Sequence, residues 1–343
     1  MPVQDDPNIS KRRDPSPRRV TAQDVAKEAG VSRSAVSRAF TPGASLDAEK
    51  RNTILAAAFK LGYRPNALAA GLSGGRSHLV AIFVGDMRNA YDSEVVAQLV
   101  GRLNALGKWP ILIDGGGRKA RDALLGEVFR YPLDALIMRA GSMEPLIAEQ
   151  CAKLNIPVIC SGRIIEADQV DNVCCRNLEG SASAARLLID RGRHRIAHIR
   201  GPESYGASDE REAGMRKALA QAGLAPVAVA QGTYTVESGY QAARDLFGRH
   251  EIDALHCAND AMAIGALGYL RECGVDVPGA VSVTGFDDIA MAAWPGIRLT
   301  TVQNPIGAAV SHIVDLLERR LSDPQKPSEV AWVETQLVLR DTH

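Results

Sequence analysis

The stretch from residue 20 to residue 62 repeats its apolar positions at the spacing of short amphipathic helices. Thr21 stands before the run Ala22–Ala29 and has a carboxylate three positions further on, a pattern that caps the amino end of a helix. Gly30 can supply the positive φ that ends this helix, and Ser32 can cap a second helix over Arg33–Phe40. The pattern predicts two helices joined by a turn short enough for a helix-turn-helix.

The second predicted helix exposes polar side chains at the positions that enter the major groove of DNA in this motif. These candidates for base contact are Arg33, Ser34, Ser37 and Arg38. An arginine can fork onto O6 and N7 of guanine, and a serine can bond a base edge or a phosphate. An amphipathic helix pair is also typical of an ordinary core. A third helix is predicted next, which Asp47 can cap and Gly62 can end. The segment that follows this third helix helps to decide between the two interpretations.

This segment is short and apolar, and it begins after Tyr63. Pro65 fixes its entry, and Asn66 can cap a brief helix that includes Ala69 and ends near Leu72. A helix this short is not stable alone in water, because nucleation costs more than so few hydrogen bonds return. A second copy packed beside it over a DNA minor groove would order it, with each leucine wedged into a base step. The alternative is a plain interdomain linker.

From residue 79 onward, short apolar runs alternate with helical patterns. The runs are Leu79–Val84, Ile111–Ile113, Ala135–Met138, Val158–Cys160, Ile196–Ile199, Ala254–Cys257 and Val281–Thr284. This alternation predicts parallel sheets with helices on both faces, and its length of about 260 residues suggests two such α/β units. Ligands of open α/β sheets bind beyond the carboxyl ends of the strands, so polar residues after these runs are candidates for a binding cleft.

Charge is distributed unevenly along the chain. Residues 1–80 hold 13 lysines and arginines against 7 acidic residues, whereas the whole chain of 343 residues has 40 of each and no net charge. Residues 1–19 combine basic clusters with four prolines and few apolar residues, which predicts a disordered basic arm. The excess positive charge therefore lies where DNA phosphates would be.

Several classes of protein find no support in the sequence. It contains no apolar run of about 18 residues and no signal-peptide centre, so we expect a cytoplasmic protein without membrane contact. The six cysteines lack C-x-x-C spacing, which favours free thiols over metal ligands. No P-loop, nucleophile elbow or dinucleotide-binding loop occurs, so we expect neither an enzyme nor a bound cofactor.

Several motifs together resemble the lactose-repressor (LacI/GalR) family of bacterial transcription regulators. They are Ala29-Gly30-Val31-Ser32, Leu61 to Ala67, Asn259 to Gly265, and Gly285-Phe286-Asp287-Asp288-Ile289 followed by Leu299 to Val302. The resemblance covers roughly the whole chain after residue 19. It implies an all-α helix-turn-helix head with a hinge helix, and an α/β periplasmic-binding-protein-like core of two doubly wound parallel-sheet subdomains.

The same resemblance assigns roles to individual residues. It implies base contacts by Arg33, Ser34 and Arg38, phosphate contacts by Thr21, Ser32 and Tyr63, and a minor-groove hinge formed by Asn66, Ala69 and Leu72. It also implies an effector site that includes Tyr91, Arg211, Tyr234, Asn259 and Asp287, with Arg139 at the end of a strand nearby.

The implied domains are the basic arm (1–19), the head (20–65), the hinge helix and linker (66–77), a core N-subdomain (78–175 and 303–320) and a core C-subdomain (176–302 and 321–343). The chain would cross between the subdomains near Arg176, Val302 and Leu321. Such a chain is expected to act as a homodimer on a nearly palindromic DNA operator.

The predicted function is sequence-specific transcriptional regulation. We expect a repressor of genes for uptake or catabolism of a carbohydrate or sugar acid, released from its operator by a small-molecule effector in the cleft. Arg139 and Arg211 favour an anionic sugar or sugar acid, because an arginine can fork onto a carboxylate. The alternatives are a purine-like corepressor or an activator within the same family, and a sugar-binding protein without a regulatory role.

We predict that Leu72→Ala weakens binding to a specific DNA site much more than binding to nonspecific DNA, because only the specific complex uses the minor-groove wedge. Titrations on both DNAs measure the ratio of the two affinities, and size-exclusion chromatography checks that the dimer persists. Equal losses on the two DNAs would show that Leu72 is not a wedge.

Overall fold

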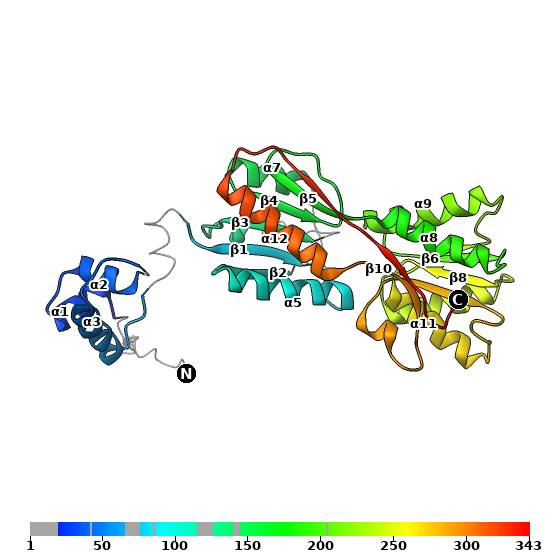
Figure 1. The fold of residues 1–343 in the computed structure, drawn as a ribbon, viewed down its shortest axis with the longest axis horizontal. Coiled ribbons are helices and arrows are strands. Elements are labelled where there is room, and N and C mark those ends of the chain that lie inside the picture. Colours follow the sequence, from blue (N-terminus) through cyan, green and yellow to red (C-terminus); the bar gives the residue numbers. More distant parts are fainter. Residues whose placement is uncertain are drawn as a thin grey trace, which may run out of the picture. The chain divides into compact units, whose positions relative to one another are not determined.

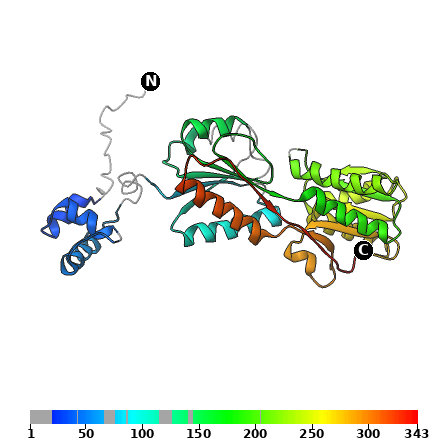
Figure 2. The same ribbon diagram turned by 45° about the horizontal axis from the view of Figure 1, so that its top comes forward.

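A computed structural model of the chain describes residues 20–41, 43–65, 76–84, 87–114, 126–139, 145–203 and 205–343. The chain divides into two compact units, one up to Ser77 and the other from His78 to His343 (Figures 1 and 2). Each unit is described by itself.

The first unit is a bundle of three short helices. They are α1 (Ala22–Glu28), α2 (Arg33–Phe40) and α3 (Ala48–Leu61). The predicted caps are present, since the side chains of Thr21, Ser32 and Asp47 each accept a hydrogen bond from a backbone N–H in the first turn. Val25 and Ile54 are fully buried where the helices meet. The helix-turn-helix prediction is confirmed.

The second unit contains two six-stranded sheets, and the first has strand order β11-β5-β4-β3-β1-β2 with every pair parallel. Its elements are β1 (Leu79–Val84), α5 (Ala90–Ala105), β2 (Trp109–Asp114), β3 (Ala135–Arg139), α7 (Pro145–Lys153), β4 (Val158–Ser161), β5 (Val170–Cys175), α12 (Ile306–Ser322) and β11 (Val330–Val333). We call this part the N-subdomain.

Helices cover both faces of this first sheet. Val80 and Ile82 of β1 pack against α5 and α12, whereas Ala81 and Phe83 pack on the other face, against α7. Because side chains alternate along a strand, one uninterrupted apolar run serves both layers. This arrangement explains why Leu79–Val84 is apolar at every position.

The second sheet has strand order β12-β10-β9-β8-β6-β7 and is parallel except for the edge strand β12. Its elements are α8 (Asn177–Asp190), β6 (Ile196–Arg200), α9 (Gly206–Gln221), β7 (Val229–Gln231), α10 (Val236–Phe247), β8 (Ala254–Cys257), α11 (Asp260–Glu272), β9 (Ser282–Asp287), the 3-10 helix η1 (Ala290–Ala293), β10 (Thr300–Gln303) and β12 (Gln336–Val338). The pair α10 and α11 covers one face, and α8 and α9 cover the other. We call this part the C-subdomain.

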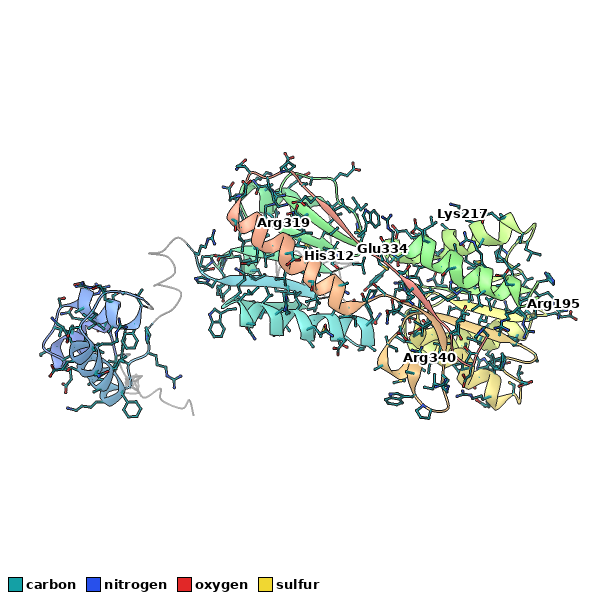
Figure 3. All side chains as sticks on the ribbon, in the orientation of Figure 1. Arg195, Lys217, His312, Arg319, Glu334 and Arg340 are labelled. Carbon is teal, nitrogen blue, oxygen red and sulfur yellow. The ribbon has the colours of Figure 1, made fainter. Side chains whose placement is uncertain are left out.

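The chain crosses between the two sheets three times within the described residues. The first crossing lies at Arg176, and the second lies between β10 and α12. We expected the third near Leu321, but residues 321–333 stay in the N-subdomain because β11 pairs with β5. The third crossing therefore comes at Glu334 and Thr335, between β11 and β12 (Figure 3), so the boundaries 303–320 and 321–343 require correction.

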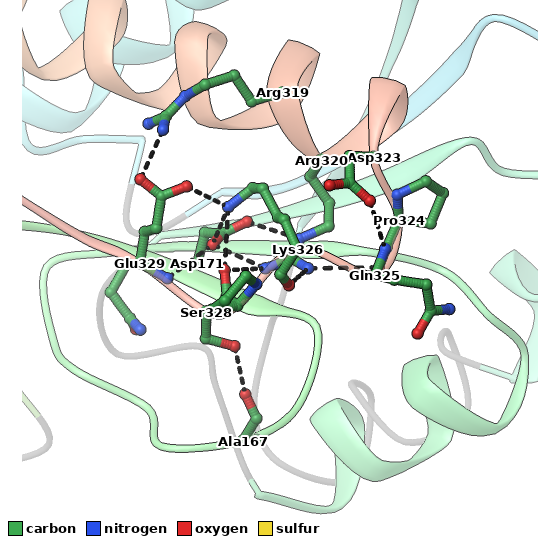
Figure 4. Close-up of polar contacts among 12 residues, drawn as sticks. Ala167, Asp171, Arg319, Arg320, Asp323, Pro324, Gln325, Lys326, Ser328 and Glu329 are labelled. Carbon is green, nitrogen blue, oxygen red and sulfur yellow. Dashed lines mark hydrogen bonds and ion pairs between the residues drawn. The ribbon is translucent and has the colours of Figure 1, made fainter.

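A buried network of charges fixes the segment that leads to this last crossing (Figure 4). Arg320, at the end of α12, donates two hydrogen bonds of 2.9 Å to the Asp171 carboxylate of β5. Lys326 also bonds Asp171, at 2.7 Å, and both Arg320 and Asp171 are almost fully buried. Burial alone would raise the pKa of Asp171, but the hydrogen bonds from Arg320 and Lys326 outweigh burial and lower the pKa.

We predict that Arg320→Met destabilises the second unit by about 3–5 kcal/mol, because it leaves Asp171 buried with less compensation. The matched control is Arg298→Met, which breaks the exposed pair Arg298–Asp341 and is expected to cost less than about 1 kcal/mol. Urea unfolding followed by tryptophan fluorescence measures both changes. Similar losses in the two variants would contradict the importance of burial.

Candidate functional site

The first unit presents the four predicted base-contacting side chains on one exposed face. Arg33, Ser34, Ser37 and Arg38 are all exposed on α2, whereas the alternate positions Ala35, Val36 and Ala39 are buried against the rest of the bundle. The packing of the bundle therefore does not depend on these four exposed side chains. The face can enter a major groove without unfolding the unit.

The predicted phosphate contacts lie at the edges of this face. Thr21 and Ser32 cap the amino ends of α1 and α2, where unpaired N–H groups and the helix dipole attract anions. The Ser32 and Ser34 hydroxyl oxygens are 2.9 Å apart, which links a helix cap to a predicted base contact. Tyr63 is half-buried and packs edge-on against Phe40, with 5.7 Å between ring centroids. Contact of these three side chains with backbone phosphates stays a prediction.

One residue that orients α2 was not predicted. Arg51 of α3 donates hydrogen bonds of 2.7 and 2.8 Å to the carbonyl oxygens of Ala39 and Ala44. The first bond satisfies a carbonyl in the last turn of α2, and the second holds the loop that follows α2. Arg51 thus holds the recognition helix against α3. Its neighbours in the sequence give no sign of this role.

The remaining DNA-related predictions lie outside the described residues. They are the hinge positions Asn66, Ala69 and Leu72, and the basic arm over residues 1–19.

The second unit contains a cleft between its two sheets, with about 610 Å³ of free space counted with its open mouth. Both subdomains contribute side chains, most of them at the carboxyl ends of strands or in the first turns of helices. The lining residues are Asn89, Tyr91, Asp92, Arg139, Ser161, Gly162, Val173, Cys175, Asn177, Tyr205, Ala207, Arg211, Tyr234, Asp287, Asn304, Ala309 and Val333.

A buried ion pair forms the polar centre of the N-subdomain wall. Arg139, at the end of β3, bonds the Asp92 carboxylate of α5 at 2.5 Å and the Ser161 hydroxyl at 2.9 Å. The guanidinium also lies 5.9 Å from the ring centre of Tyr91. Burial alone would lower the pKa of Arg139, but the Asp92 carboxylate outweighs burial and raises it. Arg139 is therefore charged at any physiological pH.

A second buried ion pair occupies the C-subdomain wall. Arg211 of α9 bonds the carboxylate of Asp287 at 3.0 Å, the side-chain oxygen of Asn177 at 2.9 Å and the carbonyl oxygen of Ala258 at 2.6 Å. Its guanidinium stacks on Phe286 at 3.7 Å from the ring centre. Burial alone would lower the pKa of Arg211, but the attraction of the Asp287 carboxylate is stronger than this effect and raises the pKa.

The backbone around this wall adopts uncommon conformations. Tyr234 has φ of 64° and Asp287 has φ of 107°, in the region that non-glycine residues seldom occupy. Tyr234 lies over Gly201, where an added Cβ would sit 2.2 Å from the tyrosine ring. Tyr205 meets Tyr234 edge-on at 5.5 Å. Strain of this kind is often concentrated at binding sites, where it fixes side-chain positions.

Five of the six predicted effector positions meet in this cleft: Tyr91, Arg139, Arg211, Tyr234 and Asp287. Asn259 is not among the lining residues. Its side-chain oxygen caps α11 by accepting from Met262 N at 3.0 Å, and its amide donates to the carbonyl oxygen of Tyr234 at 3.3 Å. Asn259 therefore supports the backbone of a lining residue.

The polar lining residues Asp92, Ser161, Asn177 and Asn304 were not predicted from the sequence. Asp92 and Asn177 stand in the first turns of helices, where a polar residue is expected for capping alone. Asn304 directly follows β10, a strand that the apolar pattern did not indicate. Recognising β10 would have been enough to identify Asn304 as a strand-end candidate.

The described residues lack the features of a metal site and of a membrane-spanning helix. No group of three or more His, Cys, Asp or Glu side chains among them could hold a metal ion. None of the helices they form is both long and apolar enough to cross a membrane.

Two family models match the chain, one in each unit. Residues 21–66 match the family "Bacterial regulatory proteins, lacI family", and residues 185–343 match the "Periplasmic binding protein-like domain". The transcriptional regulator GalR of Escherichia coli is 30% identical over 86% of this chain and 88% of its own.

Solved structures of two regulators superpose on nearly the whole chain. The complex of the regulator CelR with cellobiose has a TM-score of 0.72 at 28% identity and covers 95% of this chain and 100% of that chain. The lac repressor dimer bound to operator and the anti-inducer ONPF has a TM-score of 0.82 at 26% identity, covering 95% and 99%.

We predict that Arg38→Ala relaxes sequence preference by about 1–3 kcal/mol at one base pair, because an exposed arginine on α2 can read guanine. Lys50→Ala on α3 is the control, since it removes one charge from an exposed position outside α2. Selection from a randomised DNA pool measures preference, and a salt titration measures the charge contribution. Unchanged preference in Arg38→Ala would remove this residue from the base-reading set.

Proposed function

The chain belongs to the lacI family of bacterial regulatory proteins, and from this premise we propose that it is a repressor released from operator DNA by a ligand in the core cleft. Its family consists of DNA-binding transcription regulators and not of enzymes. We propose that it acts as a homodimer, as the lac repressor structure does on its operator. Each protomer would then contribute one helix-turn-helix to a nearly palindromic site.

The observation that carries the proposal is that both subdomains contribute charged side chains to one cleft. Asp92 and Arg139 come from the N-subdomain, and Arg211 and Asp287 come from the C-subdomain. A ligand that contacts both walls binds one closure of the cleft better than another, so it shifts the population between them. The chain from the head enters the N-subdomain at β1, and we propose that a change of closure is passed on to the DNA-binding face along this connection.

The ligand we propose is a carbohydrate. The cleft combines tyrosine faces with side chains that donate and accept hydrogen bonds, a mixture suited to the apolar faces and hydroxyls of a sugar. The similar regulator CelR has been solved with cellobiose, which supports this class of ligand for the present chain.

We predict that the purified protein protects one bounded, nearly palindromic site of about 20 base pairs, as expected for two half-sites one DNA turn apart. The ligand should weaken operator binding by about 5- to 150-fold, the range of a coupling of 1–3 kcal/mol. Footprinting near its own gene, followed by titration with candidate sugars, measures both. Tighter operator binding in the presence of ligand would make the chain corepressor-dependent. Protection without boundaries would contradict a sequence-specific regulator.

A further inference from the structure

The cleft holds two arginines, yet its four buried charged side chains have no net charge. Arg139 is paired with Asp92 on one wall, and Arg211 is paired with Asp287 on the other. Each of these four side chains is no more than about one-tenth exposed. Another carboxylate, that of Glu210, is exposed and accepts a hydrogen bond from the amide of Asn177.

Each arginine already has its positive charge balanced by a carboxylate of the protein. All three guanidinium nitrogens of Arg211 already donate to protein acceptors. Arg139 uses its two terminal nitrogens for Ser161 and Asp92. A ligand carboxylate that took the place of Asp92 or Asp287 would leave a buried carboxylate without its partner. Adding the anion without displacement would give the cleft an uncompensated negative charge.

The groups that do face the cleft suit hydroxyls. Asp92 and Asp287 use Oδ1 for their bonds to arginine, which leaves Oδ2 of each as an acceptor. The side-chain oxygen of Asn304 is buried and has no hydrogen-bond partner among the described residues. Burial raises the pKa of Tyr234 to about 12 and also raises that of Tyr91, so both phenols keep the proton that they can donate. A hydroxyl can both donate and accept, as these neighbours require.

We propose that the cleft selects an uncharged, polyhydroxylated ligand over the corresponding sugar acid, and that Asp92 sets this selectivity by neutralising Arg139. The inference rests on the proposed function, because it assumes that the cleft is the effector site. Asp92 acts as a specificity-determining residue through the charge of its partner as well as through its own oxygen. Without the Asp92 carboxylate, the positive charge of Arg139 would be available to attract a ligand carboxylate.

The test uses matched neutral and acidic sugars. Glucose with glucuronate, and galactose with galacturonate, are titrated against the full chain by calorimetry and by thermal shift. The wild-type protein should bind a neutral member at least tenfold more tightly than its acid. Asp92→Asn is nearly isosteric and gives the cleft one net positive charge, so it should shift the ratio toward the acid by at least tenfold.

Two further variants separate charge from damage to the fold. The double variant Asp92→Asn/Arg139→Gln restores neutrality and should return the preference for the neutral sugar, if in a weaker form. Asp209→Asn removes a mostly exposed carboxylate that bonds Arg200 outside the cleft, and it should leave the ratio unchanged. Circular dichroism of all variants checks that the fold persists.

The outcomes distinguish this inference from the proposed function. A wild-type preference for the acid, an unchanged ratio in Asp92→Asn, or binding of none of the four sugars would overturn the inference. Operator footprinting of the same protein tests the regulator function independently of the sugars. Specific protection together with release by an acidic sugar would leave the repressor intact and remove only the charge argument.

Discussion

The constraint on which this structure depends is the triple crossing of the chain between two sheets. The two subdomains of the second unit share one boundary. Three segments of the chain cross it: Arg176, the residues between β10 and α12, and Glu334. Strand ends from both sheets then face each other across it. A cleft at this boundary is a consequence of topology, because the carboxyl ends of parallel strands are where open α/β sheets leave space.

Buried ion pairs make that boundary costly to disturb. Removing water from a charged group carries a large penalty, which the partner charge and additional hydrogen bonds must offset. Arg211 meets this requirement with a carboxylate, an amide oxygen and a carbonyl oxygen, and Arg320 does so with Asp171 far from the cleft. The same chemistry serves two purposes. At Arg320 it anchors the last crossing, and at Arg211 it shapes the surface that meets a ligand.

The sequence predicted the helices of the first unit and most of the central strands, because local signals decide them. Caps such as Thr21 and apolar runs such as Leu79–Val84 need no distant partner to be recognised. Strands β5 and β11 escaped the apolar pattern. In β5 the buried Asp171 and Asn172 interrupt the run, and their partners lie about 150 residues away or in an irregular loop. Only the folded tertiary structure brings these partners together, so the burial of Asp171 and Asn172 could not be predicted from the local sequence.

The cleft could be located from the sequence while its charge could not, for the same physical reason. Arg139 and Arg211 lie in recognisable patterns, but a carboxylate such as Asp92 becomes their partner only after the sheet has formed. Asp92 lies in the first turn of α5, and α5 packs on β1, which is paired on both sides by β2 and β3. The backbone N–H of His78, directly before β1, is held by Asp134 at 3.1 Å. Asp92 is therefore connected, through the packing of α5 on β1, to the strand that follows the linker from the head.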